Sequence, residues 1–324
     1  MERTVVRVRA VGSADVLTLE REETPLPGPG EVQVRQTAIG LNFIDVYFRS
    51  GLYPTALPFI PGQESVGVVT AVGSGVALPV GSRVASAGVP GAYATARVLP
   101  SERVVLVPDA IDDVTAAAIM LKGMTAEYLV RRCHRIEPGQ VVVVHAAAGG
   151  VGQLLCQWAR HLGATVIGVV GRPEKSALAT TSGAHHVVVL SEHKLVDEVK
   201  RLTGGRGVDV VYDSVGKDTL AASLDSLKPR GLLVSFGQSS GLPEPLALSS
   251  LGGARSLFVT RPSLHAYVHS RGELEESSAA LFDVVTRGVV KVSAPTTFPL
   301  SAVADAHRAL EQRKTTGSVV LLPG

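Results

Sequence analysis

The chain has 324 residues, a length that suggests about two domains, and its formal net charge at pH 7 is +2. A charge this small gives no strong field for nucleic acid or an anionic membrane, so we expect a small-molecule ligand. Hydrophobic residues make up 45% of the chain and charged residues 19%, which excludes a disordered protein because enough apolar surface is present to build cores.

The cysteine content and the N-terminal residues indicate a cytoplasmic protein. Two cysteines, Cys133 and Cys156, are too few for a disulfide framework or a four-thiolate zinc site. Both fall in predicted helices and are expected to be buried, reduced thiols. The first twenty residues alternate polar and apolar side chains and lack the apolar core of a signal peptide, so no export is expected.

Residues 1–124 are predicted to form a β-rich first domain. Turn residues such as Pro27–Gly30 and Gly73–Gly75 separate short apolar runs. Alternating runs at residues 31–37 and 82–86, bounded by Gly and Pro, are typical of compact antiparallel β structure.

A second domain is predicted over residues 125–262, where β-branched apolar runs alternate with segments of helix length. Solid apolar runs are typical of strands covered on both faces, so the pattern predicts a Rossmann domain with a doubly wound, parallel six-stranded sheet. The predicted strands are 141–144, 165–170, 186–189, 208–212, 231–236 and 256–260, and the predicted helices are 151–162, 173–181, 192–202 and 217–227.

Residues 263–324 no longer follow the pattern of the second domain. Helices are predicted at 273–287 and 302–313, and a closing strand at 317–322. Two helices and one strand cannot bury their own apolar faces, so this segment is expected to return to the first domain and complete it.

The segment His145–Gly152 (HAAAGGVG) follows the first predicted strand of the second domain. Aligned on G-x-G-x-x-G, Gly149 would admit a pyrophosphate and Gly152 would let the next helix pack on the strand, while Ala147 replaces the glycine of the tight turn. The motif begins a series of βα units, and this context favours a dinucleotide site at a helix N-terminus over an empty turn.

The end of the second strand distinguishes NADP from NAD. An NAD enzyme usually has a carboxylate there for the ribose 2′-hydroxyl, but this chain has Gly171, followed by Arg172 and Lys175. Cations at this position favour a 2′-phosphate, so the predicted cofactor is NADPH. The alternative is that both are solvated surface cations near a helix start.

Two segments, Ala38–Tyr47 (AIGLNFIDVY) and Pro61–Gly67 (PGQESVG), resemble the medium-chain dehydrogenase/reductase superfamily. Its zinc alcohol dehydrogenases have a ligand Cys where Asn42 stands and a ligand His where Gln63 stands. Neither amide replaces a thiolate or an imidazole, so we expect no metal site.

Within the zinc-free branch, the sequence is similar to the NADPH:quinone oxidoreductases, the ζ-crystallin-like group, over nearly the whole chain. The resemblance implies a GroES-like catalytic domain beside the Rossmann domain. It rests on NFIDVYFRSGLY (42–53), LKGMT (121–125), HAAAGGVG (145–152), YDSVG (212–216), VSFGQSSG (234–241), VTRPSL (259–264) and the strand that starts at Gly317.

The resemblance also implies which residues contact the cofactor. Relatives often have a Tyr where this chain has Leu190, so Arg172 is expected to take over part of the 2′-phosphate binding. The full set is Phe43, Ile44, Asp45, Thr125, Gly149, Gly150, Val151, Gly152, Gly171, Arg172, Lys175, Ser214, Phe236, Gly237, Gln238, Ser239, Pro262, Ser263, Leu264 and Arg313.

Three residues are predicted to act in catalysis. Hydride transfer to a quinone needs orientation and relief of oxyanion charge but no metal. Asn42 and Tyr53 are assigned as donors to the developing quinol oxygen, and Tyr47 as a residue that positions the nicotinamide ribose or the substrate. For each Tyr the alternative is an interface residue with a satisfied hydroxyl. His145 has no expected Ser or Asp partner and is predicted to be structural.

Other functions remain open at this stage. One is NADPH-dependent reduction of the C=C bond of an enone or alkenal, which needs a proton donor for the α-carbon. Another is a non-catalytic, crystallin-like protein that binds NADPH or RNA, although the charge of +2 and 4% aromatic residues argue against RNA. The family also implies a homodimer, which we expect to form through the edge strand Ser256–Thr260.

Overall fold

The computed structural model describes residues 2–324, which divide into two compact units. Unit 1 runs up to Met124 and includes Tyr267–Thr286 and Val292–Gly324, while unit 2 is formed by Thr125–Ala266 and Arg287–Lys291. The second border therefore lies later than the predicted 262/263, and a short segment returns to unit 2. Gln157 explains that return, because its Nε2 donates to Lys291 O (3.0 Å) and its Oε1 accepts from Lys291 N (2.8 Å).

The main sheet of unit 1 is largely antiparallel, as predicted for the first domain. Its core contains buried Val and Leu side chains from neighbouring strands, such as Val34, Val69 and Leu99. The strand order is β14 (Thr296–Pro299), β15 (Val319–Leu322), β3 (Glu31–Leu41), β4 (Glu64–Val72), β5 (Arg83–Ala87) and β7 (Val105–Leu106), and β6 (Ala96–Pro100) also pairs with β3.

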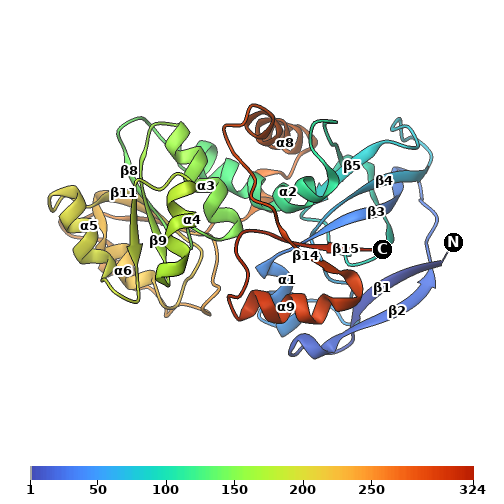
Figure 1. Ribbon diagram of the computed structural model, residues 1–324, viewed down its shortest axis with the longest axis horizontal. Helices are drawn as coiled ribbons and strands as arrows, with labels where there is room; N and C mark the ends of the chain where they lie inside the picture. The colour runs from blue at the N-terminus through green and yellow to red at the C-terminus, as the bar shows by residue number, and fades with distance from the viewer. Residues whose placement is uncertain (1) are drawn as a thin grey trace. The chain divides into compact units, whose positions relative to one another are not determined.

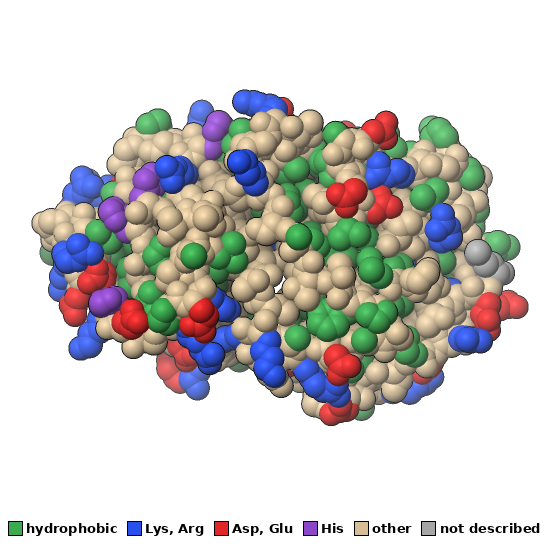
Figure 2. Space-filling model, in the orientation of Figure 1, with side chains coloured by type: hydrophobic (Ala, Val, Ile, Leu, Met, Phe, Trp, Pro, Cys, Tyr) green, Lys and Arg blue, Asp and Glu red, His purple; other side chains and the backbone are tan. Residues whose placement is uncertain are grey.

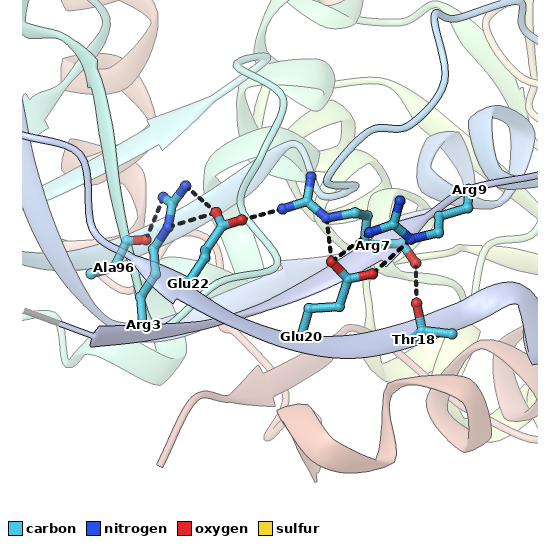
Figure 3. Close-up of polar contacts among 7 residues, drawn as sticks. All are labelled: Arg3, Arg7, Arg9, Thr18, Glu20, Glu22 and Ala96. Carbon is cyan, nitrogen blue, oxygen red and sulfur yellow. Dashed lines mark hydrogen bonds and ion pairs between the residues drawn. The ribbon is translucent and has the colours of Figure 1, made fainter.

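A separate two-stranded sheet, formed by β1 (Glu2–Val8) and β2 (Leu17–Glu23), carries a ladder of ion pairs (Figure 3). Arg3 Nη2 lies 2.6 Å from Glu22 Oε1, and Arg7 Nε lies 2.8 Å from Glu20 Oε2. Arg9 also pairs with Glu20. The alternation places these charges on one face while Val6 and Val8 on the other face enter the core, as the strand period requires.

The helices of unit 1 come from distant parts of the chain (Figure 1). The chain supplies α1 (Phe43–Ser50), most of α2 (Asp113–Tyr128), α8 (Arg271–Thr286) and α9 (Val303–Glu311), while α7 (Leu264–Tyr267) spans the border of the units. The last helix ends two residues before the predicted Arg313.

Both units also contain short helices. The 3-10 helices are η1 (Ala14–Val16), η2 (Ser101–Arg103), η4 (Pro173–Lys175), η5 (Leu248–Leu251) and η6 (Leu300–Ala302), and a π-helix, η3 (Leu129–Cys133), follows α2.

Unit 2 contains a parallel six-stranded sheet, as predicted for a Rossmann fold. Helices α3 (Gly150–His161) and α4 (Ser176–Thr181) lie on one side, and α5 (Leu195–Thr203) and α6 (Leu220–Asp225) on the other (Figure 1). The strand order is β10 (His186–Val189), β9 (Thr165–Val170), β8 (Val141–Val144), β11 (Val208–Asp213), β12 (Leu227–Ser235) and β13 (Phe258–Thr260).

The surface drawn in Figure 2 carries acidic and basic side chains interspersed over each unit. Within residues 2–324, no helix has the length and apolar character needed to cross a bilayer.

Candidate functional site

The loop between β8 and α3 has the geometry of an anion-binding turn. Ala146 adopts a left-handed conformation with φ of 50°, so the tight turn falls at Ala146 and not at Ala147, where the motif alignment put it. At Gly152 a Cβ atom would lie 2.2 Å from Ala146 O, so only glycine lets α3 begin this close to the loop. The second glycine of the motif, Gly149, is the N-cap residue of α3.

The first turn of α3 can receive a diphosphate. Helix geometry leaves the N–H groups of Gly150, Val151 and Gly152 without carbonyl partners within the helix. No side chain of this turn carries an acid that would repel an anion. The residues present therefore fit the pyrophosphate of a dinucleotide.

The ends of the other strands in unit 2 bring most of the predicted cofactor residues to one edge of the sheet. Gly171 follows β9, where a Cβ atom would have no neighbour within 4 Å, and Arg172 is exposed beside it. Ser214 and Gly237 follow β11 and β12 and lie in contact, since a Cβ on Gly237 would lie 2.6 Å from Ser214 O. Because parallel strands share the direction of their carboxyl ends, these segments meet at the edge where Rossmann folds bind ligands.

The remaining predicted residues of unit 2 lie on adjacent segments. Ser239 N donates to Ser214 O (3.2 Å), which ties the segment after β12 to the end of β11. Thr125 is buried in α2. Lys175 ends η4, Phe236 and Gln238 flank Gly237, and Pro262, Ser263 and Leu264 follow β13.

A buried polar cluster around Asp213 lies at this edge of the parallel sheet, where β11 ends, and the sequence did not reveal it. Ser223 Oγ donates to Asp213 Oδ2 (2.8 Å), so it must accept the hydrogen bond from His145 Nε2 (2.9 Å). His145 thus has the Ser and Asp partners that the sequence seemed to lack, but the polarity is wrong for activating a serine. Burial also lowers the pKa of His145.

Asp213 further accepts from Thr219 Oγ1 (2.8 Å). These bonds hold residues 215–219 as a loop, which explains why α6 is shorter than predicted.

In unit 1 the three predicted catalytic residues lie just before, on and just after α1. Asn42 is the N-cap residue, and its N–H donates to Asp45 Oδ2 (2.9 Å). Tyr47 is buried, and its ring lies 5.2 Å from the half-buried ring of Tyr53, centroid to centroid. Phe43 and Ile44, in the first turn, are half-buried. The structure thus brings together Asn42, Phe43, Ile44, Asp45, Tyr47 and Tyr53.

The orientation of Asn42 argues against its predicted role as a donor to substrate. Its Nδ2 donates to Glu64 Oε2 (2.9 Å) and to Gly40 O (3.4 Å), so both amide hydrogens are directed into unit 1. A carboxylate can only accept, so the nitrogen of the amide must face Glu64. The sequence does not reveal this contact, because Glu64 begins β4, 22 residues further along the chain.

Asp45 belongs to a second buried network. Tyr93 Oη donates to Asp45 Oδ2 (3.0 Å) and lies 3.0 Å from His307 Nε2. Arg49 Nη1 lies 3.1 Å from His307 Nδ1, and Arg49 pairs with Glu311 at 2.7 Å. Because Arg can only donate, His307 carries its hydrogen on Nε2 and gives it to Tyr93, which in turn donates to Asp45.

Burial changes the pKa of two members of this network. Loss of hydration raises the pKa of Asp45 from 3.8 to about 7, and hydrogen bonds from Asn42 and Tyr93 and the charge of Lys122 oppose that rise in part. Burial, together with the charge of Arg49, lowers the pKa of His307 from 6.5 to about 3. His307 is therefore neutral near pH 7, in agreement with its role as acceptor from Arg49.

The residues at the zinc positions of the zinc alcohol dehydrogenases do not fit that metal. Asn42 and Gln63 are both buried amides, and the amide nitrogen of Asn42 is directed at Glu64. Amides are poor zinc ligands beside thiolate and imidazole. Among residues 2–324, no group of three or more His, Cys, Asp or Glu lies in an arrangement that could hold a metal.

Arg313 is the one predicted cofactor residue of unit 1 outside the α1 region. It follows α9 in a left-handed conformation with φ of 57°. Its contact with the cofactor stays a prediction.

A GroES-like unit with a polar N-capped helix, joined to a Rossmann unit with a glycine-rich phosphate loop, defines a medium-chain dehydrogenase/reductase. Residues 28–109 match the "Alcohol dehydrogenase GroES-like domain" family, and residues 150–278 match the "Zinc-binding dehydrogenase" family. The chain is 47% identical to a quinone oxidoreductase of Pseudomonas aeruginosa over 321 residues, covering 98% of this chain and 99% of the relative.

Two further comparisons agree. A 2-haloacrylate reductase of a Burkholderia species is 46% identical over 321 residues, with 96% of each chain covered. The crystal structure of Escherichia coli quinone oxidoreductase complexed with NADPH has a TM-score of 0.96 and 45% identity, covering 99% of this chain and 100% of that one. The chain belongs to the quinone oxidoreductase family of oxidoreductases, which confirms the resemblance that the sequence suggested.

Proposed function

We propose that this protein transfers a hydride from NADPH to a quinone without a metal ion. The observation that carries the proposal is near-full-length similarity, at 45% identity, to a quinone oxidoreductase whose structure is a complex with NADPH. The phosphate loop supports it, because Gly149 and Gly152 provide the close backbone approach that a dinucleotide needs.

Unit 2 would hold the cofactor. The N–H groups of Gly150, Val151 and Gly152 would bind the pyrophosphate, and Arg172 and Lys175 the 2′-phosphate. The other predicted contacts of this unit follow the ends of β11, β12 and β13. When bound, NADPH supplies the hydride at C4 of its nicotinamide.

Unit 1 would orient the quinone and stabilise charge on its oxygen. A quinone is already electrophilic, so the protein needs to supply a fixed hydrogen-bond donor at the oxygen that becomes negative. Since the amide hydrogens of Asn42 point to Glu64 and Gly40, we assign that donor to Tyr53. Tyr47, packed against Tyr53, would keep its predicted role in positioning the nicotinamide ribose or the substrate.

The experiment is a steady-state assay of NADPH oxidation with 9,10-phenanthrenequinone, with and without prior treatment of the protein with a chelator. We expect turnover that is unaffected by the chelator, and turnover that falls at least about tenfold in Tyr53→Phe because a donor to the oxyanion is lost. Lack of turnover by wild-type protein would reject the proposal, and reversible loss on chelation would reject its metal-free form.

Reduction of an activated C=C bond is a second candidate, which the similarity to a 2-haloacrylate reductase favours. This reaction needs a proton for the α-carbon as well as a hydride. Parallel assays with 2-chloroacrylate, a 2-alkenal and the quinone separate the candidates, since the substrate with the highest kcat/KM identifies the reaction for which the site is built.

We also propose a cytoplasmic homodimer that forms through β13. This edge strand exposes Phe258 and Val259, with Phe258 60% exposed, and pairing with a second copy would cover its open hydrogen-bonding groups. The predicted strand Ser256–Thr260 is shorter in the structure, because Ser256 adopts a positive φ of 45°. Sedimentation as a monomer would contradict the dimer.

The non-catalytic alternative, a crystallin-like protein that binds NADPH or RNA, has its own test. RNA binding that weakens with salt, in a protein without quinone turnover, would favour it.

A further inference from the structure

Three sequence segments that resemble the family meet at one buried carboxylate. Glu64 begins β4 and is fully buried. Asn42 belongs to the segment before α1, and Leu121 and Lys122 belong to the LKGMT segment in α2. All four residues lie in unit 1, and the reaction proposed above assigns no role to Glu64 or Lys122.

The two oxygens of Glu64 have different partners. Oε1 accepts from the backbone N–H of Leu121 (2.7 Å). Oε2 accepts from Nδ2 of Asn42 (2.9 Å) and from Nζ of Lys122 (3.2 Å). The carboxylate therefore connects the N-cap of α1 to α2 through two hydrogen bonds, and the ammonium group of Lys122 compensates its charge.

The surroundings leave the carboxylate little room to move. Gly40, two residues before Asn42, packs directly on it, because a Cβ at Gly40 would lie 2.1 Å from Glu64 Oε2 and 2.5 Å from Ala117 O. Side chains this tightly confined keep one rotamer. Glu64 can thus impose one orientation on the Asn42 amide.

We propose that Glu64 is a positioning residue, which acts through Asn42 to fix the N-terminus of α1 and so the orientation of Tyr47 and Tyr53 toward substrate. The inference rests on the proposed function for its kinetic consequences only. Lys122 supports it by holding the carboxylate in place.

Glu64→Gln tests the proposal because the change keeps the shape of the side chain and replaces one acceptor oxygen by a donor nitrogen. If the oxygen of the introduced amide keeps the bond from Leu121, its nitrogen meets two donors, Asn42 Nδ2 and Lys122 Nζ. Asn42 must then turn its amide or lose the contact. We expect kcat with the quinone to fall by about 10- to 100-fold, as for other small displacements of reacting groups. The KM for NADPH should change less, since the phosphate loop is untouched.

A double variant, Asn42→Asp with Glu64→Gln, provides the rescue. The carboxylate introduced at position 42 can accept from the amide nitrogen introduced at position 64, so the contact returns with donor and acceptor exchanged and the total charge unchanged. We expect kcat of the double variant to exceed that of either single variant. Losses that simply add would overturn the proposal.

Glu127→Gln is the matched control. Glu127, like Glu64, is fully buried; it lies on α2 and pairs with Arg131 and Arg132 (2.6 Å to Arg132). We expect this variant to lower the melting temperature without lowering kcat selectively. If Glu64→Gln and Glu127→Gln lower kcat equally for equal losses of stability, Glu64 is structural only and the proposal fails.

A spectroscopic measurement separates this proposal from the proposed function. The side-chain amide signal of Asn42 in the nuclear magnetic resonance spectrum can be assigned by its loss in Asn42→Asp. We expect slow hydrogen exchange of this amide in wild-type protein and fast exchange in Glu64→Gln, because the bond to the buried carboxylate protects it. Equal exchange rates would refute the inference, whether or not the protein reduces quinones.

Discussion

Replacement of Asp45 by Asn is expected to change how the stability of the protein depends on pH. The pKa of Asp45 is about 7 in the folded chain, compared with the ordinary value of 3.8 in the unfolded chain. Between about pH 4 and pH 7 the folded state therefore binds a proton that the unfolded state does not. Stability therefore falls as the pH rises through this window. At about 1.4 kcal/mol for each pKa unit, the full cost above pH 7 is about 4 kcal/mol.

Asn can keep both hydrogen bonds at this position. Oδ2 of Asp45 accepts from the Asn42 N–H (2.9 Å) and from the Tyr93 hydroxyl (3.0 Å), while Oδ1 has no partner within residues 2–324. An Asn oxygen in place of Oδ2 accepts both bonds without a charge. The melting temperature of the variant minus that of the wild type should therefore increase from pH 4 to pH 8. At roughly 2 °C per kcal/mol, the increase amounts to several degrees.

The titration of His307 hides this effect in wild-type protein. Its pKa falls from 6.5 to about 3 on folding, so between those values the unfolded state binds the extra proton and stability falls as the pH falls. The slopes from His307 and Asp45 oppose each other from about pH 4 to pH 6.5. The difference in melting temperature between variant and wild type removes the contribution of His307. It can be measured by calorimetry, with the exposed Asp218→Asn as control. A difference independent of pH would refute the assignment.

Three further predictions concern the cofactor site and the interface. Arg172→Ala should lower the preference for NADPH over NADH by about tenfold or more, measured as the ratio of kcat/KM values, and an unchanged ratio would exclude Arg172 from 2′-phosphate binding. Gly152→Ala should abolish NADPH binding in calorimetry because its Cβ would lie 2.2 Å from Ala146 O, whereas Gly272→Ala, where nothing lies within 4 Å, should bind normally. Phe258→Glu should give monomers in sedimentation, and persistence of a dimer would place the interface elsewhere.

The sequence predicted the local elements of unit 2 well because their signals are local. Runs such as Val141–Val144 and Thr165–Val170 are strands at the predicted residues, and the glycine-rich loop precedes α3 as expected. The return of Arg287–Lys291 to unit 2 was not predictable, because it depends on hydrogen bonds from Gln157 to a backbone more than 130 residues away.

The sequence pointed to the residues that gather around α1, but not to the direction of their hydrogen bonds. The family resemblance pointed to Asn42, Tyr47 and Tyr53, and the structure brings them together around α1. The direction of the Asn42 amide depends on Glu64, and the state of Asp45 depends on Tyr93 and on helix α9. Such contacts join segments far apart in the chain, so no local pattern reveals them.

The most direct test of metal-free hydride transfer is a single-turnover, stopped-flow measurement with chelator-treated protein, 9,10-phenanthrenequinone, and NADPH carrying hydrogen or deuterium at C4 on the transferred face. We expect one NADPH to be oxidised for each quinone reduced, at a rate that deuterium slows and added Zn²⁺ leaves unchanged. Oxidation that depends on Zn²⁺, or no oxidation by protein that binds NADPH, would contradict it.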